Sequence, residues 1–140
     1  MNPALTRLFA ATALGLLLAA CSGASSSPES AAKTFVEKSY DGDADAVVAM
    51  IYLSDADKAK AGVEDMMRGK VKSAVERKKT YAQEQGGVDE ITADAAEPAP
   101  DRGDGSKRAI VQVSVKFKKG GAKRENVRLI ETGDGWKIRI

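Results

Sequence analysis

The sequence has no histidine and only one cysteine, and these two scarcities exclude whole classes of function. Without histidine, the chain lacks the imidazole base of Ser-His-Asp and Cys-His nucleophile systems. A single cysteine forms no disulfide within the chain, and the absence of histidine also removes the usual ligand sets of zinc. The sequence therefore predicts no metal site, no cofactor and a protein that is not an enzyme.

The chain is also poor in aromatic residues and nearly neutral. Aromatic residues make up 5% of its 140 residues, and 22 Lys and Arg against 20 Asp and Glu give a formal net charge of +2. A balanced charge does not steer a whole molecule toward nucleic acid, and the basic stretches lack the interleaved aromatic side chains that stack on single-stranded bases. No nucleic-acid partner is predicted. Hydrophobic residues at 43% and charged residues at 30% are typical of one globular domain.

The one long apolar run stands at the N-terminus and resembles the signal peptide of a bacterial lipoprotein. It covers residues 8–20, after Arg7, and as a helix it would rise about 20 Å against the roughly 30 Å core of a bilayer. It ends in Leu18, Ala19, Ala20 and Cys21, which resembles the lipobox of lipoproteins. The resemblance implies a signal peptide of residues 1–20 and a diacylglyceryl group on Cys21 that anchors the protein in a membrane. The alternative is an ordinary secretory signal that Cys21 follows by chance.

The residues after the cysteine bear on location. Ser22 stands where lipoproteins retained at the inner membrane of diderm bacteria carry Asp, so the chain resembles cargo sorted to the outer membrane. Residues 21–27 are small and polar, which is typical of a flexible tether. We therefore expect a protein of the bacterial cell envelope, on the periplasmic face of the outer membrane in a diderm organism, with a folded domain over residues 28–140.

The first half of this domain has the apolar spacing of helices. The Ser-Pro-Glu segment at 27–29 predicts a helix start, and the Asp-Gly-Asp segment at 41–43 separates two short helices. A third helix is predicted from Ser54 toward Gln85. A break at Gly62 is the alternative, because glycine weakens a helix.

After the Gly-Gly pair at 86–87 the apolar spacing changes from 3.6 residues to two, which predicts strands. The predicted strands are residues 88–96, 107–118, 122–132 and 136–140, and residues 97–106 are predicted to form a loop. Short turns join antiparallel neighbours. The predicted fold is therefore an α+β domain with three N-terminal helices packed on a four-stranded antiparallel meander sheet.

The order of these elements resembles bacterial lipoprotein domains of unknown function that adopt a nuclear-transport-factor-two-like, or cystatin-like, cone. The matching segments are Pro28–Phe35 at the start, Tyr40–Asp43 between the first helices, Gly86–Gly87 after the long helix and Gly133–Ile138 near the end. They span essentially the whole chain after the signal peptide. The resemblance implies a curved sheet wrapped around the long helix, with a pocket at the open end of the cone, and it implies no activity.

Three tyrosines are the candidates for a functional pocket inside such a cone. Some enzymes of this superfamily place Asp, Tyr or His in the interior for acid and base chemistry. Here Tyr40, Tyr52 and Tyr81 are the polar side chains that would serve a small-ligand carrier or an enzyme. For Tyr40 and Tyr81 the spacing favours the alternative of a core aromatic side chain with its hydroxyl at the rim.

Basic residues recur along the last three predicted strands. They are Lys116, Lys118, Arg124, Arg128, Lys137 and Arg139. Because alternate side chains of a strand share a face, we expect these charges on the face of the sheet away from the helices, where anionic lipid headgroups or an acidic envelope protein would bind. Glu125 and Glu131 interrupt the strip, which favours the alternative of a solvated face that charge protects from aggregation.

The sequence as a whole favours a lipid-anchored bacterial envelope protein with a non-enzymatic binding or scaffolding role. Its expected partners are the membrane, through the lipid on Cys21, and an envelope protein or anionic lipid at the basic face. The alternative function is that of a small-ligand carrier or enzyme that uses the interior of the cone.

Overall fold

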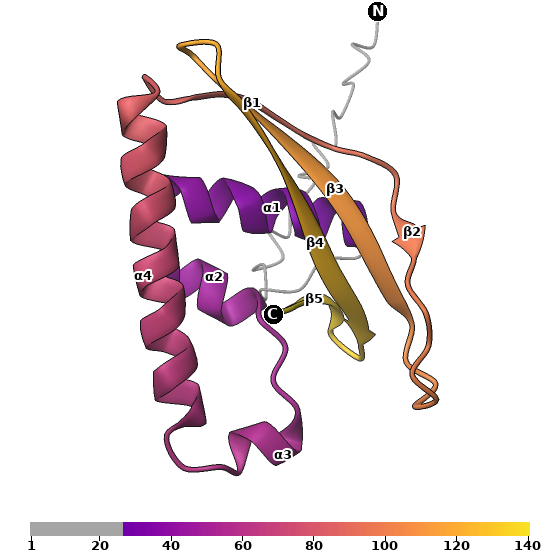
Figure 1. Cartoon of the computed structure of the whole chain (residues 1–140). Helices are drawn as coiled ribbons and strands as arrows, with labels where there is room; N and C mark the ends of the chain where they lie inside the picture. The colour runs from indigo at the N-terminus through magenta and orange to yellow at the C-terminus, as the bar shows by residue number, and fades with distance from the viewer. Residues whose placement is uncertain (1–26) are drawn as a thin grey trace, which may run out of the picture.

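The computed structural model describes residues 27–140, which fold into four helices followed by five strands (Figure 1). The helices are α1 (Pro28–Asp41), α2 (Ala44–Met50), α3 (Asp55–Lys58) and α4 (Val63–Glu84), and the strands are β1 (Val88–Ala93), β2 (Glu97–Pro98), β3 (Arg108–Phe117), β4 (Ala122–Thr132) and β5 (Gly135–Arg139). The predicted signal peptide, the lipobox residues Leu18, Ala19 and Ala20, and Cys21 lie outside the described residues.

The first two helices begin and end where the sequence predicts. Oγ of Ser27 caps α1 by accepting a hydrogen bond from the backbone N–H of Ser30 at 3.1 Å. Gly42 ends α1 with a φ of +87°, a left-handed conformation that glycine adopts without strain. Asp43 then caps α2 by accepting a hydrogen bond from the N–H of Ala46 at 3.1 Å.

The predicted third helix is divided into α3 and α4, so the predicted number of three helices is wrong. Ser54 begins the short helix α3, where its Oγ accepts a hydrogen bond from the N–H of Asp57 at 3.1 Å. Gly62 then adopts a φ of +79°, directly before α4 begins at Val63. A left-handed residue interrupts the helical series of hydrogen bonds, so the break named as the alternative is the one that occurs.

The strands form one antiparallel sheet in the order β1-β3-β4-β5, and β2 pairs with the same edge of β3 as β1 does. The prediction that residues 97–106 form only a loop is wrong at Glu97–Pro98, which pair with Ala109 and Ile110. Proline is tolerated there because an edge strand needs no outward N–H group. The N–H of Ala99 continues the pairing by donating to the carbonyl oxygen of Arg108 at 3.0 Å.

The core lies between α1 and the inward face of the sheet. Alternate residues of β3 are between 0% and 5% exposed, and they are Ala109, Val111, Val113, Val115 and Phe117. On α1, Ala31, Ala32 and Val36 are fully buried, and they belong to the same hydrophobic cluster as the valines of β3. The small alanine side chains allow the helix to approach the strands closely, which gives the dense packing of a protein interior.

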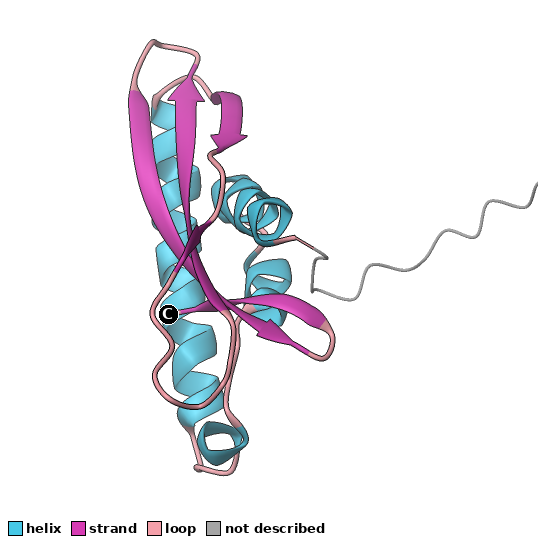
Figure 2. Ribbon diagram, turned by 90° about the vertical axis from the view of Figure 1, so that its right-hand side faces the viewer, coloured by secondary structure: helices cyan, strands magenta, loops and turns pink. Residues whose placement is uncertain are grey.

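α1 is the helix that crosses the sheet. The resemblance to cone domains implied instead that the sheet wraps around the long helix, which is α4. α1 contacts β1, β3, β4 and β5, and α4 packs mainly against α1 and α2 (Figure 1; Figure 2). That implied detail is therefore wrong. Only Met67, Val71, Val75 and Ala82 of the 22 residues of α4 are buried, so this helix lacks the apolar surface needed to lie between two layers.

A matched pair of glycine substitutions tests the break before α4. An added methyl group meets no neighbouring atom within 4 Å at Gly62 or at Gly69, but only Gly62 has a positive φ. We expect Gly62→Ala to destabilise the fold by about 1 kcal/mol, because alanine is strained in the left-handed conformation. Gly69→Ala, inside α4, should stabilise the fold by roughly 0.5–1 kcal/mol, because alanine loses less backbone entropy in a helix.

Urea unfolding of the two variants and the parent chain measures these changes. Shifts of opposite sign are expected. Shifts of the same sign would contradict the assignment of different backbone conformations to the two glycines.

Candidate functional site

A carboxylate with two partners lies on the inward face of the sheet. Glu125 of β4 belongs to the same alternate series as the buried residues Val127 and Leu129. Its Oε1 accepts a hydrogen bond from the hydroxyl of Tyr40, on α1, at 2.7 Å. Its Oε2 forms an ion pair with Nζ of Lys78, on α4. Tyr40, Lys78 and Glu125, here called the Glu125 cluster, thus tie two helices to the sheet and occupy both carboxylate oxygens.

The setting of Tyr40 makes it a poor proton donor. Burial raises the pKa of the Tyr40 phenol far above its ordinary value, and the hydrogen bond to Glu125 and the negative charge of that carboxylate raise it further. A general acid works best when its pKa lies near the working pH. Tyr40 therefore keeps its proton near neutral pH and holds Glu125 in place.

The aromatic contacts beside this cluster are those of a packed core. The ring of Phe117, at the end of β3, contacts Tyr40 and Tyr81 with centroid separations of 5.6 and 5.2 Å and interplanar angles of 67° and 83°. Such edge-to-face pairs contribute about 0.5–1.5 kcal/mol each beyond the area they bury. Nζ of Lys123 lies 3.6 Å from the centre of the Tyr81 ring, within range of a cation–π interaction. The structure thus links Tyr40 and Tyr81 through Phe117.

Tyr52 takes no part in these aromatic contacts. Its backbone N–H donates to the carbonyl oxygen of Ile138 at 2.7 Å, next to a parallel bridge between Ile51 and Ile138. This pairing covers the outer edge of β5. The three tyrosines named from the sequence therefore do not surround one common space.

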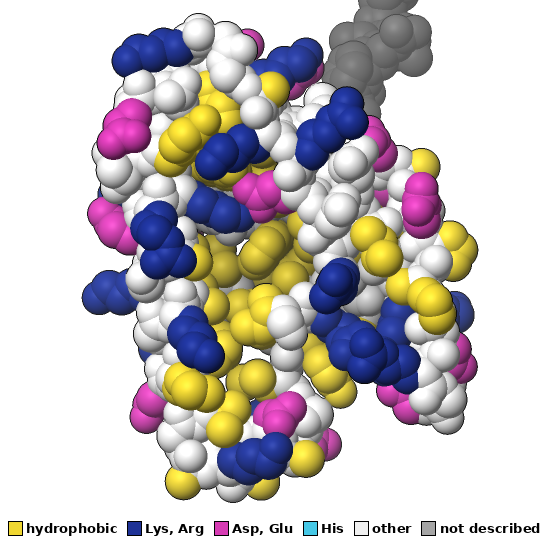
Figure 3. Space-filling model, viewed as in Figure 1, with side chains coloured by type: hydrophobic (Ala, Val, Ile, Leu, Met, Phe, Trp, Pro, Cys, Tyr) yellow, Lys and Arg dark blue, Asp and Glu magenta, His cyan; other side chains and the backbone are white. Residues whose placement is uncertain are grey.

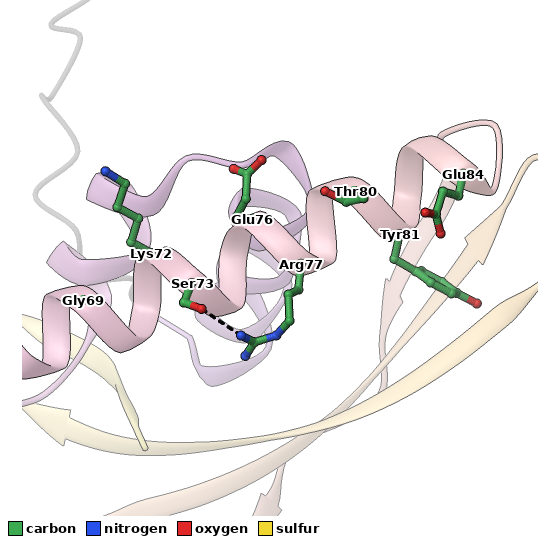
Figure 4. Close-up of a pocket in the computed structure, with 8 residues that line it drawn as sticks. All are labelled: Gly69, Lys72, Ser73, Glu76, Arg77, Thr80, Tyr81 and Glu84. Carbon is green, nitrogen blue, oxygen red and sulfur yellow. Dashed lines mark hydrogen bonds between the residues drawn. The ribbon is translucent and has the colours of Figure 1, made fainter.

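A hollow of about 760 Å³ runs along one side of α4 (Figure 4). Its lining residues are Gly69, Lys72, Ser73, Glu76, Arg77, Thr80, Tyr81 and Glu84, and all of them belong to this one helix. Inside it, Nη1 of Arg77 donates to Oγ of Ser73 at 2.8 Å. A ligand site normally encloses most of its ligand, so this hollow is a helix surface rather than a pocket.

In the part of the chain that the structure describes, no helix has the length and hydrophobicity of a membrane span.

A smaller hollow of about 200 Å³ opens between the helices, where Figure 3 shows apolar side chains at its base. Its lining residues are Phe35, Ser39, Val47, Ile51, Lys70, Val71, Ala74, Val75, Lys78 and Ile140. No carboxylate side chain is among them, and the hydroxyl of Ser39 donates to the carbonyl oxygen of Phe35 at 2.7 Å. Over residues 27–140, no three side chains of His, Cys, Asp or Glu are arranged to hold a metal ion.

On the outer face of the sheet, the predicted basic strip falls into separate groups. Lys116 pairs with Glu90 of β1 at 2.9 Å, and this hydrogen bond and charge pair raise the pKa of Lys116 and lower that of Glu90. Lys118 lies beyond the end of β3, in the turn to β4. The outward positions of β4 and β5 hold Arg124, Arg128, Lys137 and Arg139, and Arg128 stands directly opposite Arg139.

The two glutamates that were expected to interrupt the strip do not lie within it. Glu125 is part of the inward cluster, and Glu131 belongs to the same inward series, where it pairs with Lys107 at 3.3 Å. The expectation was wrong because it followed distance along the chain rather than the alternation of faces. The outer face of β4 is therefore more uniformly basic than the sequence suggested.

Two arginines outside the predicted strip lie beside Arg128 and Arg139. Arg108, at the start of β3, and Arg102, in the loop between β2 and β3, line with them a pocket of about 390 Å³. Figure 3 shows Lys and Arg side chains gathered over the ends of β3 and β4 beside that loop. The alternation of β3 already places Arg108 on the outer face. No periodic signal places Arg102, because its loop is irregular.

Two comparisons with known proteins bear on this architecture. A family model described as a domain of unknown function (DUF4878) matches residues 19–139. A crystal structure from Campylobacter jejuni, of a protein provisionally named an NTF2-like transpeptidase, is similar to this chain with a TM-score of 0.68 and 27% sequence identity. The match covers 82% of this chain and 99% of that chain. No curated protein matches the sequence.

The structural match confirms the predicted fold class. This chain and the Campylobacter protein share the NTF2-like, or nuclear-transport-factor-two-like, arrangement of helices followed by a curved antiparallel sheet. The predicted likeness to domains of unknown function is confirmed as well.

Removing one hydroxyl from each tyrosine beside Phe117 tests the Glu125 cluster. We expect Tyr40→Phe to destabilise the fold by about 1.5–3 kcal/mol at neutral pH, because a hydrogen bond to a carboxylate is lost. Tyr81→Phe is the matched control. It keeps the ring contact with Phe117 and, within residues 27–140, removes no hydrogen bond, so its effect should stay below about 0.5 kcal/mol.

The difference between Tyr40→Phe and the parent chain should shrink at alkaline pH. Because folding raises the pKa of Tyr40, the protonated phenol stabilises the fold fully below the ordinary tyrosine pKa of about 10. This contribution declines as the pH rises from there toward the raised pKa. Urea midpoints measured from neutral to alkaline pH should converge for these two chains. A constant gap for Tyr40→Phe would refute the assignment.

Proposed function

The chain belongs to the DUF4878 family of domains of unknown function, and from its own residues we propose what it does. It is a lipid-anchored protein of the bacterial cell envelope whose domain binds or scaffolds a partner without catalysing a reaction. The lipid on Cys21 holds it in the membrane, residues 21–27 connect the lipid to the domain, and the outer face of the sheet meets the partner. In a diderm organism it stands on the periplasmic face of the outer membrane.

The observation that carries this proposal is the position of Cys21. It is the one cysteine of the chain, and it follows an apolar run that ends in Leu18, Ala19 and Ala20. The family match begins at residue 19, so it leaves out nearly all of the apolar run and includes the cysteine. Ser27 caps α1, so the first helix of the domain begins at Pro28, seven residues after Cys21.

The interior of the cone supports a role without catalysis. Covalent acyl transfer needs a nucleophile beside a base. Residues 27–140 contain neither cysteine nor histidine, and the buried Ser39 gives its hydroxyl to a main-chain carbonyl. Both oxygens of Glu125 are engaged, and Tyr40 holds its proton. These groups stabilise the fold, and each of them already has a partner within the domain.

The name of the Campylobacter protein suggests a second candidate function, that of a transpeptidase. In this chain such an activity, like that of a small-ligand carrier, would use the interior of the cone. The hollow between α1, α2 and α4 is about 200 Å³ and has no acidic side chain in its lining, whereas ligand pockets usually enclose about 300–1,000 Å³. One fold hosts many functions, so the residues present decide between the candidates, and they favour binding.

The outer face supports an anionic partner, either a lipid headgroup or an acidic envelope protein. Arg124, Arg128, Lys137 and Arg139 share this face, and the glutamates of β4 lie on the inward series. The seven residues 21–27 reach at most about 25 Å, so a domain anchored at Cys21 stays close to the bilayer. Near an anionic surface each basic residue contributes about 1 kcal/mol of attraction.

Lipid attachment at Cys21 is tested with the full-length chain expressed in a diderm bacterium. We expect the parent chain to incorporate labelled fatty acid, to sediment with membranes in high salt and to dissolve only in detergent, because acyl chains rather than charges hold it. Cys21→Ala should incorporate no label and keep its leader, which intact-mass measurement detects.

Ser22→Ala is the matched control, since it alters the neighbouring residue and keeps the thiol. It should be labelled like the parent chain. Label on Cys21→Ala, or an uncut leader on the parent chain, would show that Cys21 is not the anchor.

A further inference from the structure

The pocket lined by Arg102, Arg108, Arg128 and Arg139, here called the arginine pocket, gathers four guanidinium groups from three strands and one loop. The loop between β2 and β3 passes in front of the strands in Figure 2 and contributes Arg102. The rest of the lining has no acidic side chain, and it consists of Ala99, Pro100, Ala109, Ile110, Leu129 and Ile140. Arg128 and Arg139 stand opposite each other on neighbouring strands, an arrangement of like charges that destabilises a sheet unless an anion compensates it.

Arg108 has a largely buried side chain with one donor nitrogen that lacks a partner. Its side chain is only 8% exposed, because the loop folds around it. Nε donates to Oγ of Ser106 at 3.1 Å and Nη2 donates to Oδ2 of Asp104 at 2.6 Å. Nη1 is buried and has no hydrogen-bond partner among residues 27–140. Buried donors without a partner are rare in proteins, and this one belongs to a side chain that lines the arginine pocket.

The positive charge of the pocket is only partly balanced. Asp104 pairs with Arg108, and hydrogen bonds from Ser106 together with that arginine's charge lower the pKa of Asp104 to about 2. Burial and the charges of Arg108 and Arg102 lower the pKa of Arg139, and among the nearby charges only Asp104 opposes them. Among the side chains, four guanidinium groups therefore lie near a single carboxylate, that of Asp104.

The remaining arginines are free to bind an anion. No ion pair within 4.0 Å joins Arg102, Arg128 or Arg139 to a carboxylate of residues 27–140, the main-chain carboxylate of Ile140 included. A face that charge merely protects from aggregation would keep its cations exposed. Here Arg108 is buried, and Ile130, at an outward position opposite it, is only 5% exposed. This end of the outer face is therefore partly covered at Arg108 and Ile130, while Arg102 and Arg128 remain exposed.

The pocket also lies near the point where the chain enters the domain. Pro28, the first residue of α1, and Arg108 line one hollow of about 430 Å³ beside the same loop. A domain held through residues 21–27 therefore carries the loop of the arginine pocket next to its attachment to the membrane.

We propose that the arginine pocket binds the phosphate group of a phosphoester, with the guanidinium groups of Arg102, Arg128 and Arg139 as donors and the positive charge of Arg108 beside them. The planar fork of arginine matches the oxygens of phosphate, and several forks around one group suit phosphate better than a two-oxygen carboxylate. The phosphate is that of a lipid headgroup or of a soluble phosphoester. This inference deepens the proposed binding function and rests on it, because it names the chemistry that the outer face recognises.

The test is a titration of the full-length chain in neutral detergent micelles, followed by NMR of its backbone amides. One arm adds inorganic phosphate, and the other mixes phosphatidylglycerol into the micelles. We expect shifts in the amides of residues 99–110, Arg128 and Arg139. Arg128→Gln and Arg139→Gln should each weaken the apparent affinity about ten-fold, because a charge-assisted contact is lost. Arg108 is left unchanged, since its hydrogen bonds hold the loop.

Arg124→Gln is the matched control, because it removes an arginine from the outer face of β4 that does not line the pocket. Its affinity should stay within two-fold of the parent chain. Binding in the inorganic arm supports a soluble source of phosphate, and binding in the lipid arm alone supports a headgroup. No response to either probe, or equal affinities for the parent chain and the two pocket variants, would overturn the proposal. An unmodified Cys21 would refute the anchor and leave this titration unaffected, so the two failures are distinguishable.

Discussion

The packing of β3 against α1 is the constraint on which the rest of the structure depends. β3 pairs with β1 and β2 along one edge and with β4 along the other, so its position determines that of the whole sheet. Its inward valines are buried against the small side chains of α1. Because a strand has a period of two, this burial turns every second residue outward, and a slip by one residue would exchange the faces. The same contact thus builds the core and aligns the basic side chains outside it.

Much of the fold could be predicted because its signals are local. The caps at Ser27 and Asp43 and the alternation along β3 depend on residues a few positions apart. The break at Gly62 depends instead on a competition between a continuous helix and a turn of similar free energy. The pairing of Pro98 depends in the same way on a competition between a loop and an edge strand. Local sequence does not decide such a competition, and for Pro98 the deciding partner is Ala109 in the next strand along the chain.

In the candidate sites, too, local sequence predicts some features and leaves others undecided. Alternation was sufficient to place Glu125 inward, two residues before Val127, and Arg108 outward, but it says nothing of their partners. Tyr40 and Lys78 reach Glu125 from helices far away in the sequence, and Arg108 is buried only because the loop between β2 and β3 folds back over it. The Campylobacter protein has the same fold, yet a fold positions such groups without dictating their use.

The pairing of Tyr52 with Ile138 has a consequence for crowding. This pairing occupies one edge of the sheet. At the other edge, β1 carries the adjacent acidic residues Asp89 and Glu90, and β2 is short and contains Pro98. Where proteins are crowded, exposed strands recruit neighbours into shared fibrils. With both borders of the sheet closed or charged, many copies of this domain can lie close together and remain separate molecules.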